Sequence, residues 1–314
     1  MDFLKNIPMR KHLSTDALIN EIYEWAKKVT DSRSEKDRKI PISDAIMSGY
    51  AIFSLKNSSL LEFQNQIRDN PNLRRVFKIS RLMSDTQIRE ILDRIEIEEF
   101  EPIFKKIFAH FQRGKELEKF TYLGGYHILS SDGTGYFSST TIHCENCLEK
   151  KNKKTGEVKE YYHQMYSASI VHPDMSTVIP LMPEPIIKQD GSNKNDCERN
   201  ASKRFYERFR RNHPHLKIIA VEDGLASNAP HIRLLQSLDI RYIIGAKEKD
   251  HKYLYQEFDV NRKNHKTTQV KIEKGQITHI FSYIYSNQNG FRILLNSASL
   301  AVGVNACQRG LSGA

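Results

Sequence analysis

At 314 residues the chain has room for one large domain or two ordinary ones, each with a buried core. Hydrophobic residues make up 39% and charged residues 27%, and no apolar run approaches the roughly 20 residues that a membrane span needs, so a membrane protein is excluded. The formal net charge of +10 favours a polyanionic partner such as nucleic acid.

Cysteine usage and the N-terminal segment bear on where the protein works. Four cysteines are too few for a disulfide scaffold in a chain of this length, which fits a reducing compartment. The first residues, M-D-F-L-K-N-I-P, hold neither an apolar signal core nor a small-residue cleavage site. We therefore expect a cytoplasmic protein.

Residues 1–120 have the pattern of short helices joined by tight links. Capping residues precede apolar stripes at helical spacing, as in Ser14-Thr15-Asp16 and Ser84-Asp85-Thr86. Further helices are expected after a Ser43-Asp44 cap, over Leu60–Ile67, over Leu73–Phe77 and over Phe100–Phe111. This organisation predicts a helical DNA-binding domain.

Basic residues gather in one part of this region, and they are candidates for contacts with DNA phosphates. The alternative is that their charges form an ordinary solvated helix face. The four residues are Arg74, Arg75, Lys78 and Arg81.

From Tyr122 onward the pattern changes to strands and helices. Three strands are expected first, then a helix, a strand, a helix and a strand, which is the element order of the RNase H-like fold. We therefore predict an α+β or α/β fold with a mixed sheet flanked by helices. The expected elements are a strand that reaches Asp132 and is broken by Gly133 and Gly135, strands Tyr162–Val171 and Thr177–Leu181, helix Cys197–Arg211, strand Leu216–Val221, helix Ala229–Leu238 and strand Arg241–Gly245.

Two aspartates stand out because each follows an apolar strand and precedes a glycine. They are Asp132 and Asp223, and the first and fourth strands of the predicted fold are neighbours. Paired carboxylates can hold two divalent ions roughly 3.5–4 Å apart for phosphodiester chemistry. Hard oxygen ligands select Mg²⁺ or Mn²⁺. The alternative to a shared metal site is that the two aspartates form two unrelated Asx turns.

The chain also resembles a known family at several motifs: S-S-D-G-T, Y-Y-H-Q-M from Tyr161, M-P-E-P-I-I-K-Q-D-G from Met182, K-N-D-C-E-R-N-A from Lys194 and V-E-D-G-L-A-S-N-A-P-H-I from Val221. Together these motifs, over about residues 80–280, are similar to bacterial insertion-sequence transposases with a DDE catalytic domain. The resemblance implies recognition of terminal inverted repeats in double-stranded DNA, hydrolysis at the element ends and strand transfer. It also implies a homodimer on paired ends, and it matches Asp132 and Asp223 to the first two acidic residues.

The third acidic residue of that family lies in a segment resembling W-x-I-E-N-E, and nothing like it follows Ile280. We therefore expect a DNA-binding domain over 1–120, an incomplete catalytic domain over 121–285 and a non-native tail over 286–314. Glu222 is expected to face away from Asp223, and Glu198 to lie on the wrong helix to replace the missing carboxylate. A catalytically inactive DNA-binding regulator of transposition is the alternative function.

Two further groups carry less weight. His143-Cys144-x-x-Cys147 has metal-ligand spacing that His163 or His172 would complete as a zinc site, but a single CxxC makes reduced thiols the default expectation. The helix that begins near Cys197 is basic, and its side chains either meet phosphates or form a charged face. The residues considered there as DNA contacts are Arg199, Lys203 and Arg204.

Overall fold

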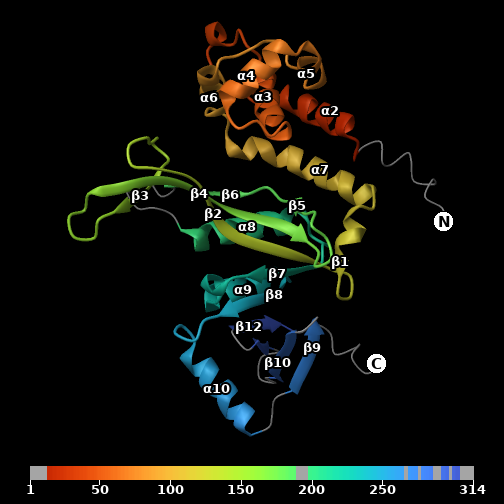
Figure 1. Ribbon diagram of the computed structural model, residues 1–314, viewed down its shortest axis with the longest axis vertical. Coiled ribbons are helices and arrows are strands. Elements are labelled where there is room, and N and C mark those ends of the chain that lie inside the picture. The colour runs from red at the N-terminus through yellow and green to blue at the C-terminus, as the bar shows by residue number, and fades with distance from the viewer. Residues whose placement is uncertain are drawn as a thin grey trace, which may run out of the picture. The chain divides into compact units, whose positions relative to one another are not determined.

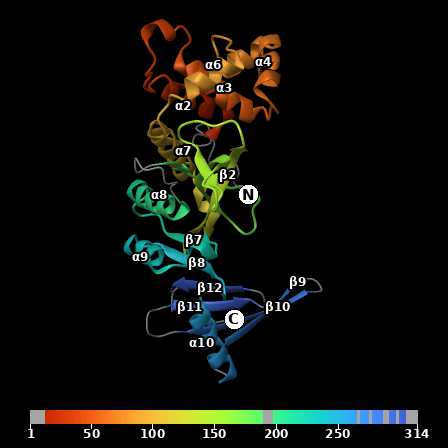
Figure 2. The ribbon, with the colours of Figure 1, turned by 90° about the vertical axis from the view of Figure 1, so that its left-hand side faces the viewer.

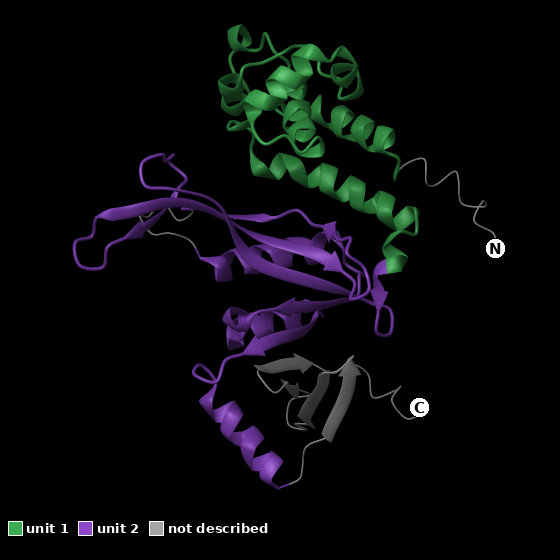
Figure 3. Ribbon diagram, viewed as in Figure 1, with its two compact units in different colours: residues 1–119 green, residues 120–314 purple. Residues whose placement is uncertain are grey.

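The computed structural model describes residues 13–188 and 197–264, and it describes only the backbone of four later strands within 268–304. The chain divides into two compact units, residues 1–119 and 120–314, which are described separately (Figure 3). Among the described residues, no helix combines the length and apolar character required to cross a membrane.

The first unit is helical (Figure 1). Short 3-10 turns lie at Glu35–Asp37, Ile97–Phe100 and Leu117–Phe120. Its α-helices are α2 Thr15–Ala26, α3 Ile42–Ser54, α4 Leu60–Asp69, α5 Pro71–Val76, α6 Asp85–Leu92 and α7 Glu101–Arg113.

Side-chain caps set most of the helix starts in this unit. The Ser14 side chain accepts from the Ala17 amide at the start of α2, and Ser84 forms a capping box with Gln87 at the start of α6. Asn70 ends α4 and caps α5, where Pro71 takes the first helical position. The helix caps predicted at Ser14 and Ser84 are thus confirmed.

The prediction of a Ser43-Asp44 cap is wrong, because α3 begins at Ile42 and both residues lie buried in its first turn. Asp44 bonds elsewhere: its Oδ2 accepts from the Ser80 amide at 3.1 Å, the Ser80 hydroxyl at 2.6 Å and the Arg81 amide at 2.8 Å. Several accepted hydrogen bonds offset the free-energy cost of removing a carboxylate from water. Asp44 therefore ties α3 to the link before α6.

Apolar stripes from five helices form the core of the first unit. Trp25, the only tryptophan, packs beside Phe100 with ring centroids 5.0 Å apart, and its Nε1 donates to the Glu99 carbonyl at 2.9 Å. Burial of such apolar side chains supplies the main stabilising free energy of the unit. The buried core includes Ile19, Ile22, Ala45, Met47, Ala51, Phe63, Ile67, Ile88, Ile91 and Ile103.

The second unit is built on one mixed sheet, with strand order β3-β4-β2-β7-β8-β12-β11-β10-β9. Its helices are α8 Glu198–Asn212, α9 Ala229–Ser237 and α10 Lys252–Lys263, and a 3-10 turn spans Gly224–Ala226. Its strands are β1 Thr121–Tyr122, β2 Tyr126–Ser139, β3 Leu148–Lys151, β4 Val158–Val171, β5 Ile179–Pro180, β6 Glu184–Ile186, β7 Ile218–Glu222, β8 Arg241–Ala246, β9 Thr268–Lys274, β10 Ile277–Tyr285, β11 Phe291–Asn296 and β12 Ser299–Val304.

The centre of this sheet has the arrangement predicted from the sequence. Strand β2 pairs antiparallel with β4 on one side and parallel with β7 on the other, and β7 pairs parallel with β8. Helices α8 and α9 lie on the same side of β2, β7 and β8 (Figure 2). The mixed α/β class and the adjacency of the first and fourth expected strands are therefore confirmed.

Several strand boundaries differ from the prediction. Strand β2 does not end at Asp132 but continues through Gly133 and Gly135 to Ser139, with a register shift between Gly135 and Phe137. The glycines do not break the strand because β4 pairs with it from Ile128 to Ser139. Strands β3 and β6 are not among the expected elements: β3 contains the adjacent Lys150 and Lys151, and β6 contains Pro185.

After α10 the backbone forms a further antiparallel group, β9 to β12, which joins the sheet through pairing of β12 with β8. Strands β11 and β12 fall within the predicted tail, 286–314. Residues 305–314, which include the A-C-Q-R-G-L-S-G-A ending, lie outside the described residues.

Candidate functional site

The parallel register of β2 and β7 places the two aspartates side by side. Their pairing runs from His127 opposite Ile218 to Ser130 opposite Val221. One step further, the Ser131 hydroxyl lies 3.4 Å from Glu222 Oε1. The next step in the same register is Asp132 beside Asp223, and neighbouring strands lie about 4.8 Å apart.

Both aspartates are exposed, and each is held by a backbone amide close in sequence. Asp132 Oδ1 accepts from the Gly133 amide at 2.8 Å, and Asp223 Oδ1 accepts from the Leu225 amide at 2.8 Å. Asp223 also lies 3.8 Å from the Lys247 ammonium, in a pair that is more than half exposed. These bonds orient the carboxylates without burying them.

Glu198, the first residue of α8, lies beside these aspartates, although the sequence led us to expect it on the wrong helix to replace the missing carboxylate. Its carboxyl group lies over Gly133: a Cβ added there would meet Glu198 Oε2, with Cδ only 2.6 Å away. Burial raises the pKa of Glu198, and the negative charges of Asp132 and Asp223 raise it further. The start of α8 therefore brings a third carboxyl group to the two aspartates.

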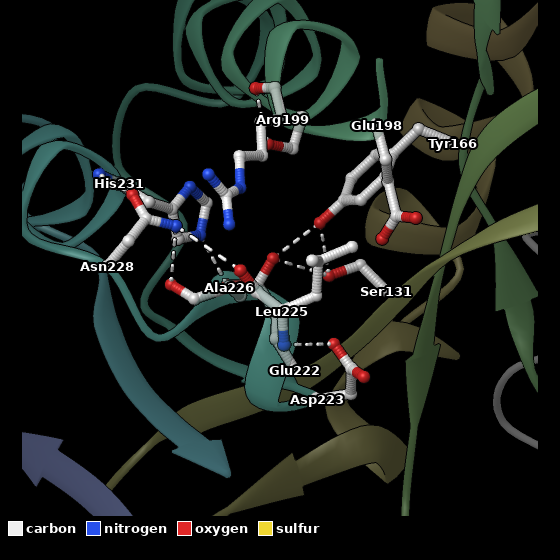
Figure 4. Close-up of a pocket in the computed structure, with 11 residues that line it drawn as sticks. Ser131, Tyr166, Glu198, Arg199, Glu222, Asp223, Leu225, Ala226, Asn228 and His231 are labelled. Carbon is white, nitrogen blue, oxygen red and sulfur yellow. Dashed lines mark hydrogen bonds and ion pairs between the residues drawn. The ribbon is translucent and has the colours of Figure 1, made fainter. Parts of the chain in front are cut away.

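A buried hydrogen-bonded network lies next to the site (Figure 4). Glu222 Oε1 accepts from the Tyr166 hydroxyl at 2.5 Å, and its Oε2 lies 2.7 Å from His231 Nε2. Ser131 Oγ lies 2.9 Å from the Tyr166 hydroxyl and 3.0 Å from that of Tyr206 on α8. Burial raises the pKa of both tyrosines, so they stay protonated donors. As strand alternation predicts, Glu222 faces the interior while Asp223 is exposed.

A small pocket opens above this network between α8 and the loop after β7 (Figure 4). Ser131, one of its lining residues, is the neighbour of Asp132 on β2. The pocket is lined by Ser131, Tyr166, Glu198, Arg199, Ser202, Glu222, Asp223, Leu225, Ala226, Asn228 and His231. Three acidic side chains, Glu198, Glu222 and Asp223, therefore line the same pocket as Arg199.

The basic residues of α8 divide into two groups. Arg199 and Lys203 are exposed. Arg204, a candidate DNA contact, instead donates to buried Glu184 at 2.6 Å and to the Pro185 carbonyl at 3.0 Å, and Arg208 donates to the same carboxylate at 2.5 Å. These charge-assisted bonds hold α8 on β6, so Arg204 is a structural residue.

The basic cluster of the first unit also falls into two parts. Arg75 and Arg81 are exposed. Arg74 donates to the Ser80 carbonyl at 3.0 Å, and the Lys78 ammonium lies 5.0 Å from the centre of the Tyr23 ring. Arg74 and Lys78 are only half-buried, so all four basic side chains of this cluster still contribute positive charge at the protein surface.

The Cys144-x-x-Cys147 pair meets His163 of β4, one of the two histidines that the sequence offered as partners. His172, the other, contacts Asp174 and packs edge-on against Tyr122. His143, which the sequence offered as a further zinc ligand, does not join this group: its ring stacks on Tyr161 and its Nδ1 lies 3.0 Å from the Thr141 carbonyl.

Sequence reasoning missed four residues of the site. Lys247 directly follows β8, so the rule that carboxyl ends of parallel strands meet at one edge could have found it. Tyr166 and Tyr206 carry no such signal, because each lies within an ordinary amphipathic strand or helix whose facing partners the sequence does not specify. His231 lies in the motif that begins at Val221, but the motif alone gave it no role.

Comparison with known proteins leaves the family open. No protein-family model and no curated protein matches the chain. A solved structure titled as the cryo-EM structure of a piggyBac transposase synaptic complex with hairpin DNA aligns with a TM-score of 0.37 at 12% sequence identity. That alignment covers 98% of this chain and 62% of the other, so this chain spans less than two thirds of its length.

Proposed function

We propose that the chain is a DNA transposase whose second unit cleaves and joins phosphodiester bonds with divalent metal ions. The observation that carries the proposal is the meeting of Asp132, Asp223 and Glu198 where β2, β7 and α8 come together. The resemblance of the surrounding motifs to insertion-sequence transposases supports the same chemistry.

The donor set fits Mg²⁺ or Mn²⁺, because three carboxylates offer hard oxygen ligands. Burial is the main cause of the raised pKa of Glu198, and the negative charges of Asp132 and Asp223, which a divalent cation would neutralise, add to it. Bound at such a site, divalent ions activate the attacking oxygen and stabilise the leaving oxygen of a phosphodiester. Asp132, Asp223 and Glu198 are the residues that would hold them.

The remaining side chains have supporting roles in this proposal. Arg199 and Lys203 are exposed on α8, where their charges would meet the phosphates next to the scissile bond. Lys247, beside Asp223, would do the same from the end of β8. In the first unit, Arg74, Arg75, Lys78 and Arg81 would hold DNA through its backbone, and two copies would act on paired ends.

The test uses the full chain, Mg²⁺ or Mn²⁺, and a linear DNA that carries the genomic flanks on both sides of its coding sequence. We expect metal-dependent nicks with free 3′-hydroxyls at the element ends. Asp132→Asn, Asp223→Asn and Glu198→Gln should each abolish them. The matched control is Glu207→Gln, an exposed residue of the same helix, which should cleave normally.

Cleavage that survives both aspartate substitutions would disprove the site. DNA binding without cleavage in the unmodified chain would favour the alternative function, an inactive DNA-binding regulator.

A further inference from the structure

The turn between β2 and β3 holds a second cluster of metal-ligating side chains. Cys144 Sγ and Cys147 Sγ lie 3.7 Å apart, and each lies 3.3 Å from His163 Nε2. In the part of the chain whose side chains are described, this is the only group of three His, Cys, Asp or Glu residues with ligand atoms so close together.

These spacings are those of ligands on one tetrahedral ion. With Zn–S near 2.3 Å and Zn–N near 2.05 Å, tetrahedral angles place two sulfurs about 3.8 Å apart and a sulfur about 3.6 Å from a nitrogen. The observed separations agree with these values within a few tenths of an ångström. A disulfide would instead need sulfurs about 2.05 Å apart, and both thiols are free.

The surroundings already orient the three ligands. The Cys144 amide donates to Cys147 Sγ at 3.3 Å, and the Cys147 amide donates to the Cys144 carbonyl at 3.2 Å, which fixes the turn. The His163 ring stacks on the Tyr136 ring with centroids 5.7 Å apart. It also contacts the Phe137 ring in a tilted arrangement, with centroids 5.6 Å apart. Aromatic contacts on this ring limit the directions in which Nε2 can point.

We propose that Cys144, Cys147 and His163 bind a zinc ion that clips the β2–β3 turn onto β4. Cys144 is exposed, so water can take the fourth position.

The ion is separate from the carboxylate site, since His163 pairs with Phe137, five residues beyond Asp132 on β2. On β4 His163 lies four residues from Ser167, the partner of Asp132, and at about 3.4 Å per residue that places the two sites roughly 14 Å apart. Leu148 begins β3 directly after Cys147, so the ion fixes the root of the basic β3–β4 hairpin.

Metal analysis of the purified full chain tests the proposal. We expect about one zinc per chain, lost in Cys144→Ser and in His163→Gln. Two exposed residues outside the cluster provide matched controls, and Cys197→Ser and His215→Gln should keep the metal. Zinc retained in Cys144→Ser, or absent from the unmodified chain after expression with added zinc, would overturn the assignment.

Thiol alkylation followed by mass mapping gives a second readout that does not depend on folding of a variant. In the zinc-loaded chain we expect Cys197 to react while Cys144 and Cys147 are protected, and a chelator should expose both within the same protein. Replacing zinc with Co²⁺ should produce a thiolate-to-metal charge-transfer band. Equal reactivity of Cys144, Cys147 and Cys197 with and without zinc, or a Cys144–Cys147 disulfide in the isolated chain, would refute the proposal.

Discussion

At the scale of single residues, Gly133 is a position where a side chain would collide with a residue of the candidate site. Its missing Cβ leaves room for the Glu198 carboxyl group, which lies within 2.6 Å of where that carbon would be. Gly133→Ala should therefore push Glu198 away from Asp132 and Asp223. If the proposed chemistry holds, a shift of about 1 Å should lower the cleavage rate on the order of a hundredfold.

The matched control for this substitution is Gly135→Ala, two residues along the same strand. There an added Cβ finds its nearest atoms 3.9 Å away, at ordinary contact distance. DNA cleavage and circular dichroism should be measured on both variants. Equal activities would show that Glu198 has no part in the reaction.

Tyr166 should contribute measurably to the free energy of unfolding, because its hydroxyl donates to buried Glu222. Tyr166→Phe leaves that carboxylate short of a donor, and an unsatisfied buried acceptor costs about 1–3 kcal/mol of unfolding free energy. Urea denaturation monitored by circular dichroism would measure it. Tyr253→Phe is the control, since Tyr253 is 78% exposed and should change nothing. A Tyr166→Phe chain as stable as the unmodified one would mean that Glu222 is compensated elsewhere.

The sequence identified the two aspartates but not the third carboxyl group. Asp132 and Asp223 could be found because each stands next to a glycine after an apolar run, and parallel pairing needs only the strand order. Glu198 could not be placed, since its position depends on the angle at which α8 crosses the sheet. That angle is set by the Glu184 bonds to Arg204 and Arg208, which join distant parts of the sequence.

At the scale of elements, α8 offers a comparison between two neighbouring basic residues. Lys203→Ala should weaken DNA binding and leave stability unchanged, because Lys203 is exposed. Arg204→Ala should destabilise the protein by about 3 kcal/mol, since it removes a partner from the buried Glu184 carboxylate. Binding isotherms at two salt concentrations and urea denaturation would measure both quantities. A stable Arg204→Ala chain with weakened DNA binding would reverse the two assignments.

Helices were easier to predict than strands for a physical reason. A cap such as Ser84 with Gln87 acts over three residues, so the sequence contains the whole signal. The length of β2 depends instead on β4, whose pairing continues past Gly133 and Gly135. Strand β3 likewise exists because Leu148 and Glu149 pair with Tyr162 and Tyr161.

At the scale of the whole molecule, stability should depend on pH, and Asp31 makes a specific contribution to this dependence in the first unit. Its hydrogen bonds from Arg33, at 2.8 and 2.7 Å, lower its pKa from the ordinary 3.8 despite partial burial. A lowered pKa adds stability that is complete above pH 3.8 and is lost as pH falls through the folded value. Asp31→Asn should cost about 3 kcal/mol at neutral pH and progressively less below pH 4.

Fluorescence of Trp25 measures this unfolding within the first unit, because it is the only tryptophan in the chain. Asp69→Asn is the control: its pair with Arg68 spans 3.5 Å and is more than half exposed, so its loss should be undetectable. A difference between the unmodified and Asp31→Asn chains that stays constant from pH 7 to pH 3 would contradict the assignment.

The parallel pairing of β2 with β7 has a consequence for biosynthesis. The β2–β4 hairpin joins segments close in sequence, whereas β7 is synthesised after β4 and α8. Local contacts form sooner than distant ones, and domains fold from the N-terminus as the ribosome releases them. A nascent chain thus folds its first unit before Asp223 exists beside Asp132. Under the proposed function, a ribosome-bound chain could engage nearby DNA, including the gene that encodes it, while still unable to cut it.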